Sequence, residues 1–161
     1  MTVTDVEKDL AARTMTITAQ FAAPPERVWQ IWDDPRQLER WWGPPTHPAT
    51  VVDHDLRAGG HVTYFMTSQD GEKFHGWWSV LSAEPPHRLT LEDGFGDDPG
   101  RPADGMPVTA LEVTLSAVDS GTRMVIRSTY PSTEAMEQLL AMGMDEGMRQ
   151  ALSQIEKILA G

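Results

Sequence analysis

The side chains of this sequence that can move protons or hold a ligand are carboxylates and histidines, because the chain contains no cysteine. Two histidines, His54 and His61, flank a short turn at residues 57–60. Two histidines with a nearby aspartate would suit zinc binding or an acid–base pair. Histidines on strand surfaces are common, however, and no motif places metal ligands at these positions. We therefore expect neither a metal site nor a cofactor; the remaining histidines are His47, His75 and His87.

Among the acidic residues, Asp93 has the most informative position. It shares strand parity with Leu89 and Leu91, so its carboxyl group would face an apolar interior. Burial would raise the pKa of that group and let it act as an acid or as a polar anchor for a ligand. The simpler alternative, which the sequence alone favours, is that Asp93 ends its strand or caps the next turn. The other acidic candidates are Asp53, Asp55 and Glu112.

The elements that position these residues begin with a cluster of tryptophans. Four of the six tryptophans lie between Trp29 and Trp42. Each tryptophan buries on the order of 200 Å² of surface, which is more than a short helical segment can hide within itself. The segment must therefore pack against a large concave surface or form one wall of a cavity. We expect Trp41 and Trp42 to stand at the mouth of that cavity, with Trp41 nearest to a ligand.

The periodicity of apolar residues predicts the order of the elements. A helix that starts at residues 23–26 and a second one at 35–41 follow the first strand. Apolar residues at steps of three or four predict one long helix at 135–159. Residues 1–12 are expected to form a flexible tail. Alternation with period two predicts strands at residues 13–21, 50–56, 61–67, 74–83, 87–93, 108–118 and 122–130.

Two glycines interrupt the long helix predicted at the end of the chain. Gly143 and Gly147 are four residues apart, so they lie on one helix face. Each costs roughly 1 kcal/mol relative to alanine inside a helix. One interpretation is close packing of the helix on the sheet. The other is space for a ligand under the helix, or a hinge that admits it.

Length and composition limit the class of protein. With 161 residues, of which 40% are hydrophobic, the chain is expected to form a single domain over 1–161. The net charge of −11 argues against binding to nucleic acid or to a membrane surface. The charged start and the absence of a long apolar run indicate neither a secretory signal nor a membrane span, so we expect a cytoplasmic protein.

Several motifs occur in the order found in one known family. The segment 25–35 with Trp41-Trp-Gly43 looks like the helical signature of the activator-of-heat-shock-ATPase homologue family, within the SRPBCC (START/Bet v-like) superfamily. Asp55-Leu-Arg-Ala-Gly-Gly60 resembles its strand–turn motif, and Pro85-Pro-His-Arg-Leu89 and Gly121-Thr-Arg-Met124 resemble later ones. The resemblance covers residues 14–159. A tryptophan often found near Gly147 in that family is methionine here.

The resemblance implies an α+β helix-grip fold. In this fold an antiparallel sheet of about seven strands carries two short helices after the first strand and a long C-terminal helix over its concave face. It also implies a largely apolar cavity between the sheet and the long helix. By face parity, the residues expected to line the cavity are Trp41, Tyr64, Met66, Trp78, Leu91, Asp93, Phe95, Met106, Leu111, Met124, Tyr130, Leu140, Met144 and Met148.

The segment 94–107 is rich in glycine, proline and aspartate and is predicted to be a loop at the rim of the cavity. Phe95 and Met106 are its only apolar side chains of any size, and they could close over a ligand as a lid. The alternative is a flexible, solvated loop.

Three functions are compatible with these features. We favour a small-molecule binding protein that holds an apolar or aromatic ligand, and we expect binding rather than catalysis. The second is a module that contacts a chaperone ATPase, as the family name suggests, although the extra N-terminal domain of eukaryotic members has no counterpart in this sequence. The third is a cyclase- or hydrolase-type enzyme that uses Asp93, Tyr64 or a histidine as acid or base. A homodimer is allowed by the resemblance, but no coiled-coil seam requires one.

Overall fold

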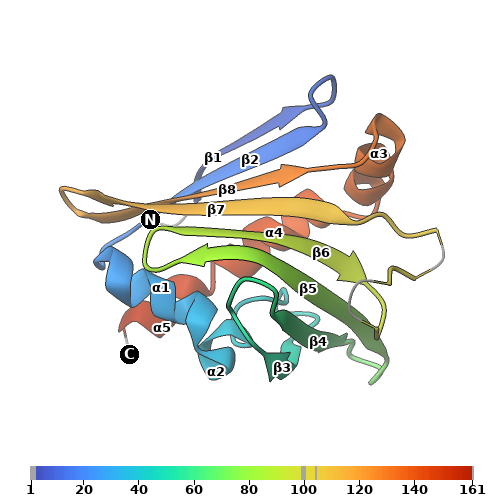
Figure 1. Cartoon of the computed structure of the whole chain (residues 1–161), viewed down its shortest axis with the longest axis horizontal. Helices are drawn as coiled ribbons and strands as arrows, with labels where there is room; N and C mark the ends of the chain where they lie inside the picture. Colours follow the sequence, from blue (N-terminus) through green and yellow to red (C-terminus); the bar gives the residue numbers. More distant parts are fainter. Residues whose placement is uncertain (1–2, 99–100, 104, 161) are drawn as a thin grey trace.

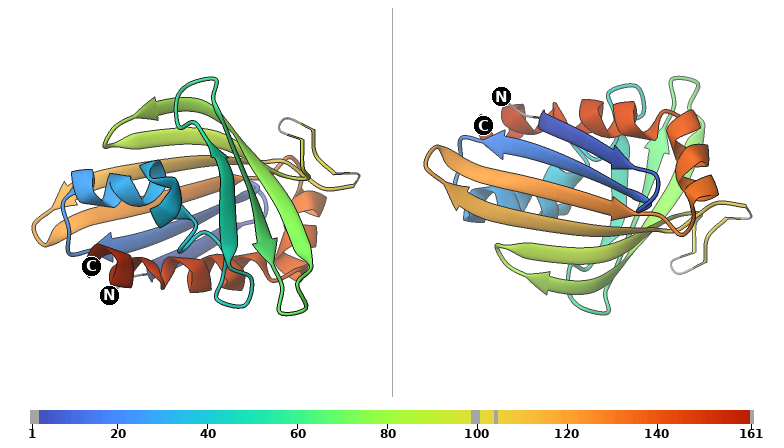
Figure 2. Two further views of the ribbon diagram at one scale, coloured as in Figure 1. Left: turned by 90° about the horizontal axis from the view of Figure 1, so that it is seen from below. Right: turned by 90° about the horizontal axis from the view of Figure 1, so that it is seen from above.

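A computed structural model describes residues 3–98, 101–103 and 105–160 of the chain. Its eight strands form one antiparallel sheet in the order β1-β2-β8-β7-β6-β5-β4-β3, which curves around the helices (Figures 1 and 2). The family fold expected from the sequence is confirmed, with eight strands rather than about seven. The strands are β1 (Val3–Asp9), β2 (Thr14–Phe21), β3 (Ala49–His54), β4 (His61–Thr67), β5 (Lys73–Glu84), β6 (Arg88–Phe95), β7 (Thr109–Val118) and β8 (Gly121–Thr129).

Two helices, α1 (Pro25–Asp33) and α2 (Pro35–Leu38), connect β2 to β3. A proline in the first turn starts each helix, because that position needs no backbone N–H. Between them, Asp34 has an extended backbone and its side chain accepts a hydrogen bond from the Arg36 backbone N–H. The two helices predicted after the first strand are therefore confirmed, although α2 ends at Leu38 rather than at residue 41.

The prediction of a flexible tail at residues 1–12 is wrong for residues 3–9. These residues form β1, which pairs antiparallel with β2 through partners such as Val6 and Ile17. β1 uses backbone hydrogen bonds that the edge of β2 offers, and such pairing does not require a strongly apolar sequence. Residues 1 and 2 lie outside the described part.

The single long helix predicted at residues 135–159 is three helices: α3 (Thr133–Ala141), α4 (Met144–Leu152) and α5 (Ile155–Ala160). Gly143 has a φ of +82°, a conformation that ends α3 and that glycine adopts without strain. At the second break, the Gln154 side chain donates a 2.8 Å hydrogen bond to the Gly43 carbonyl. The apolar stripe persists across both breaks, since Met136, Leu152 and Ile155 are fully buried and the residues between them, Leu140, Met144 and Met148, are partly buried against the same core.

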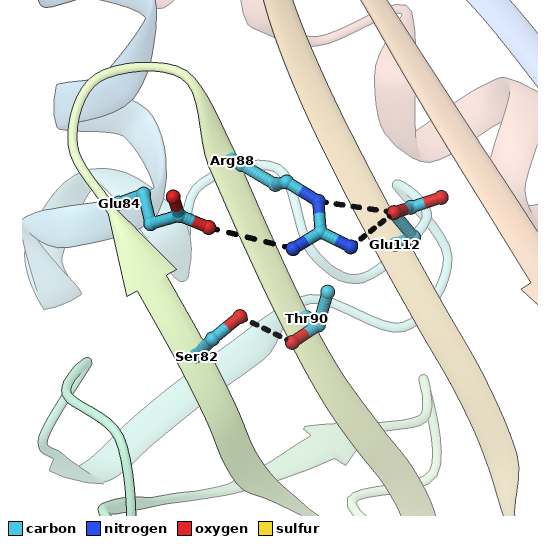
Figure 3. Close-up of polar contacts among 5 residues, drawn as sticks. All are labelled: Ser82, Glu84, Arg88, Thr90 and Glu112. Atoms are coloured by element: carbon cyan, nitrogen blue, oxygen red, sulfur yellow. Dashed lines mark hydrogen bonds and ion pairs between the residues drawn. The ribbon is translucent and has the colours of Figure 1, made fainter.

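The two faces of the sheet differ as the strand alternation predicts. Leu111, Val113 and Leu115 of β7 are buried in the core with the helices, while neighbouring residues point outward. On the outer face, Arg88 of β6 donates hydrogen bonds to Glu84 of β5 and Glu112 of β7 (Figure 3). No helix in the described part of the chain is long and apolar enough to cross a membrane.

Candidate functional site

A cavity of about 240 Å³ lies between the concave face of the sheet and the helices α3 and α4. We call it the inner cavity. Strands β4 and β6 form its floor, α3, α4 and the junction between them form its roof, and the segment after α2 closes one side. Its lining residues are Trp42, Pro44, Tyr64, Met66, Asp93, Phe95, Leu139, Met142, Met144, Gly147 and Met148.

A hydrogen-bonded pair supplies the polar part of the inner cavity. The Tyr64 hydroxyl on β4 donates to Asp93 Oδ1 on β6 over 2.9 Å. Strand β5 lies between these two strands, so the tyrosine ring has to cross it. Gly76 of β5, the residue opposite Tyr64, allows this, because an added Cβ would overlap the Tyr64 ring. The glycine therefore positions the only acid–base pair of the cavity among the described residues.

Burial controls the protonation of this pair. Loss of water raises the pKa of Asp93 to about 7, and the hydrogen bond from Tyr64 opposes the shift without cancelling it. Burial and the nearby Asp93 charge raise the pKa of Tyr64 well above its usual value, so this hydroxyl stays protonated. Asp93 can therefore exchange a proton near neutral pH. The alternative prediction, that Asp93 ends its strand or caps the next turn, is wrong, because β6 continues to Phe95 and the carboxyl group accepts a hydrogen bond from Tyr64.

A group of tryptophans forms the wall next to this pair. Trp42 packs edge-on against Trp78 and Trp41, with ring centroids 4.8 and 5.5 Å away, and lies 6.1 Å from the Tyr64 ring. Its buried indole N–H forms no hydrogen bond of standard geometry within the described residues. The same N–H interacts with Tyr64 and lowers the pKa of the hydroxyl. The indole N–H of Trp78 is also buried without a hydrogen-bond partner among the described residues, so the wall is aromatic and offers few satisfied polar groups.

The roof has open space at a specific residue. Gly147 lines the inner cavity, and a Cβ added to it would meet no atom within 4 Å. This favours space under the helix over close packing as the role of Gly147. Gly143 also has open space, but its positive φ gives it the separate task of ending α3. Half-buried Met144 and Met148 flank Gly147 along α4.

An open groove of about 630 Å³ adjoins the inner cavity. We call it the outer groove. Met66, Phe95 and Met142 line both spaces and so form the boundary between them. Phe74 and Met142 at its rim have 47% and 61% of their surface exposed, which is high for apolar side chains in contact with a groove. Met106 of the predicted lid lines this groove rather than the inner cavity, and residues 99–100 and 104 of that loop lie outside the described part.

The structure brings only some of the predicted lining residues together. Six of them line the inner cavity: Tyr64, Met66, Asp93, Phe95, Met144 and Met148. Leu140 is half-buried and packs against the core. Met106 lines the outer groove, and the other six are buried core residues, namely Trp41, Trp78, Leu91, Leu111, Met124 and Tyr130.

Trp42 rather than Trp41 faces the inner cavity. Trp41 has no exposed surface, and its indole N–H donates a 2.9 Å hydrogen bond to the Ile31 carbonyl. The structure therefore places Trp42, rather than the predicted Trp41, next to the inner cavity. The two residues follow the end of α2. Alternation with period two applies to strands, so it could not show which of the two side chains faces the cavity.

Five lining residues were absent from the set expected by face parity: Trp42, Pro44, Leu139, Met142 and Gly147, although Trp42 was expected at the mouth of the cavity. Two of them carried a signal, since Trp42 belongs to the tryptophan cluster and Gly147 is an interior helix glycine. The positions of Leu139 and Met142 depend on the break at Gly143. A continuous helix would have turned them toward other neighbours.

The remaining candidate acids and histidines are held by other contacts. Asp55 pairs with Arg57, and the Thr63 hydroxyl donates to Asp53. His54 Nε2 lies 2.9 Å from the Trp32 carbonyl, and His61 Nδ1 lies 3.4 Å from the Ser79 hydroxyl. In the part of the chain that is described, no three histidine, aspartate or glutamate side chains are grouped to hold a metal ion.

Comparisons with known proteins agree with this architecture. The family described as Activator of Hsp90 ATPase homolog 1-like protein matches residues 22–160. The crystal structure of protein Ms6760 from Mycobacterium smegmatis is 53% identical, covers 98% of this chain and 96% of its own, and gives a TM-score of 0.89. The solution structure of a protein from Arthrobacter aurescens is 48% identical, with coverage of 99% and 92% and a TM-score of 0.94.

A more distant relative shares the same fold. The crystal structure of a protein from Rhodobacter sphaeroides is 25% identical, covers 97% of both chains and gives a TM-score of 0.84. Among curated proteins, none matches the chain.

Proposed function

This chain belongs to the family of Activator of Hsp90 ATPase homolog 1-like proteins, and from that premise we propose that it binds an apolar or aromatic small molecule in the inner cavity. The observation that carries the proposal is the open space beneath Gly147, bounded by apolar side chains and a single polar pair. Ligand sites in proteins have this composition, with few polar groups that fix orientation.

The size of the inner cavity suits a small ligand. A cavity of about 150 Å³ holds a benzene molecule, so a volume of about 240 Å³ suits one or two rings, or a short chain. A longer ligand would pass Met66, Phe95 and Met142 and continue into the outer groove. Methionine side chains adapt their shape easily, which would let this boundary open.

Native mass spectrometry of the purified protein with a library of lipids and aromatic metabolites tests the proposal. Tryptophan fluorescence is recorded in parallel, because a bound molecule contacts Trp42. Gly147→Leu fills the space under α4 and is expected to abolish binding while the protein stays folded. Ala141→Leu adds the same side chain at an exposed position of α3 and should bind like the wild type. Equal binding by both variants, or none by the wild type, would refute the proposal.

A second candidate function, acid–base catalysis, is favoured by one observation. The pKa of Asp93 lies near 7, which suits a group that must both accept and release a proton at neutral pH. Turnover of a bound library compound that is lost in Asp93→Asn would support an enzyme. Binding without turnover, with recovery of a heat-shock ATPase in a pull-down, would instead support the chaperone contact that the family name describes.

A further inference from the structure

We propose that the inner cavity selects small apolar amines, whose ammonium group pairs with Asp93 while the hydrocarbon part lies between Trp42 and the methionines of α4. This inference rests on the proposed binding function and adds the chemical class of the ligand.

Charge balance in the inner cavity carries the proposal. Asp93 is the only charged side chain among its described lining residues. Asp93 Oδ1 accepts the hydrogen bond from Tyr64, and within the described residues no donor bonds the second oxygen, which keeps some accessible surface. A half-buried carboxylate that lines an apolar cavity without a counter-ion is unfavourable. An ammonium group supplies the missing charge together with N–H donors for the free oxygen.

The walls of the cavity favour the same ligand class. The face of a tryptophan ring attracts cations through its quadrupole, and Trp42 lies next to the Tyr64 ring that bonds Asp93. Methionine thioethers at 144 and 148 are polarizable and accommodate an organic cation better than rigid aliphatic groups do. The net charge of −11 also raises the local concentration of cations around the molecule.

The other titratable groups near Asp93 keep their charge around neutral pH. Tyr64 of β4 and Tyr130, which follows β8, are both neutral, since burial raises the pKa of Tyr130 to about 12. Asp145 of α4 is ionised, because its ion pair with Lys8 lowers its pKa. Among the described residues that line the inner cavity itself, Asp93 is therefore the one whose charge changes close to pH 7, while His47, Lys73, His75 and Asp97 line the adjoining outer groove.

Three ligands of matched shape test the inference: 4-phenylbutylamine, 4-phenylbutanol and 4-phenylbutyrate. Their dissociation constants are measured by calorimetry between pH 6 and pH 8.5 for the wild type and two variants. Asp93→Asn removes the carboxylate. Asp119→Asn removes an equal charge from the exposed turn between β7 and β8 and serves as the matched control.

We expect the amine to bind at least tenfold more tightly than the alcohol at pH 8, and the butyrate to bind most weakly. Below pH 7 the affinity for the amine should fall toward a tenfold loss per pH unit, because Asp93 must lose its proton to form the pair. The alcohol should show no such trend. Asp93→Asn should remove the preference for the amine but keep the alcohol within about threefold, and Asp119→Asn should change neither.

Two different results would overturn the inference. Binding of the alcohol with no preference for the amine, or with the butyrate tightest, would refute amine selection and leave the proposed binding function intact. Retention of the preference in Asp93→Asn would place the recognition elsewhere. If none of the three ligands binds at millimolar concentration, the proposed binding function fails together with the inference.

Discussion

Two stretches of the apolar stripe on the C-terminal helices, which we call its closed end and its open end, are built differently, although Met136 and Leu139, which precede the open end in α3, are also buried. At the closed end, Leu152, Ile155 and Ile158 have at most 3% of their surface exposed and pack in the core with the tryptophans of α1. At the open end, Met144 and Met148 are half-buried over the inner cavity, and Met142 is 61% exposed. The same helical periodicity therefore serves a packed core at residues 152–158 and borders the inner cavity at residues 142–148.

Polar contacts follow the same division. At the closed end, Arg27 of α1 donates a 2.8 Å hydrogen bond to the Ile158 carbonyl, and Gln154 donates to the Gly43 carbonyl. At the open end, the ion pair between Lys8 and Asp145 and a 3.4 Å hydrogen bond from Gln138 to Gly105 are exposed, and the Tyr130 hydroxyl donates a part-buried 3.4 Å hydrogen bond to Met144 Sδ. Exposed ion pairs contribute little to stability. The closed end thus has the part-buried backbone contacts that hold the helices, and we expect ligand entry at the open end.

The largest effect on the free energy of unfolding should be seen when two side chains of the stripe, one turn apart on α4, are each shortened to alanine. Leu152→Ala removes a fully buried side chain at the closed end and should cost about 2–5 kcal/mol of unfolding free energy. Met148→Ala, over the cavity, should cost about 1 kcal/mol or less, because its side chain already borders empty space. Urea denaturation measures both. Equal losses would contradict the division into two ends.

The free energy of unfolding should depend on pH through Asp93, the carboxyl group that lines the inner cavity. The pKa of Asp93 is about 7 in the folded protein against 3.8 for the unfolded chain, so the folded state holds the proton more tightly. Its contribution to stability is therefore complete below pH 4, falls as the pH rises from 4 to 7 and is constant above pH 7. The loss could reach roughly 4 kcal/mol by proton linkage.

Thermal unfolding of the wild type and Asp93→Asn between pH 4 and pH 8 measures this contribution. The variant should be less sensitive to pH across this window, and the difference between the two proteins should grow as the pH rises. Asp119→Asn should follow the wild type. Parallel curves for the wild type and Asp93→Asn would contradict the prediction, because they would show that folding does not raise the pKa of this carboxyl group.

The smallest effects should come from two glycines on opposite walls of the cavity. Gly147→Ala should stabilise the protein by about 0.5–1 kcal/mol, because alanine favours helix and its methyl group meets no atom. Gly76→Ala should instead destabilise it and raise the pH at which ligand binding changes, because the new methyl group displaces the Tyr64 ring from Asp93. Chemical denaturation separates the two signs. Stabilisation by both substitutions would mean that Tyr64 does not depend on Gly76.

Much of the fold could be predicted from the sequence because its signals are local. The alternation in Leu111, Val113 and Leu115 determines which face of β7 is buried, and the prolines at 25 and 35 start the two short helices. β1 escaped prediction because its pairing depends on the free edge of β2 rather than on its own apolar residues. Gly143 was recognised as unusual, but its positive φ is a property of the folded backbone.

The candidate site was less accessible to such reasoning. Asp93 could be placed near an apolar interior by strand parity, yet its bond to Tyr64 crosses an intervening strand and requires Gly76 beneath the ring. Parity also assigned buried core residues such as Leu91 and Met124 to the cavity, because it identifies the inner face without showing where that face is left uncovered. The open space depends on the break at Gly143 and on Gly147. It becomes visible only when α3 and α4 are placed over the sheet.

The most direct test of the account uses the methionines, which occur both around the inner cavity and in the packed core. Protein labelled with ¹³C at the methionine methyl groups is titrated with 4-phenylbutanol and followed by NMR. The account predicts that the signals of Met66, Met144 and Met148 shift with the ligand, while those of the fully packed Met15, Met124 and Met136 stay in place. Shifts confined to the packed methionines, or no shift at any of the six, would contradict a binding site under α3 and α4.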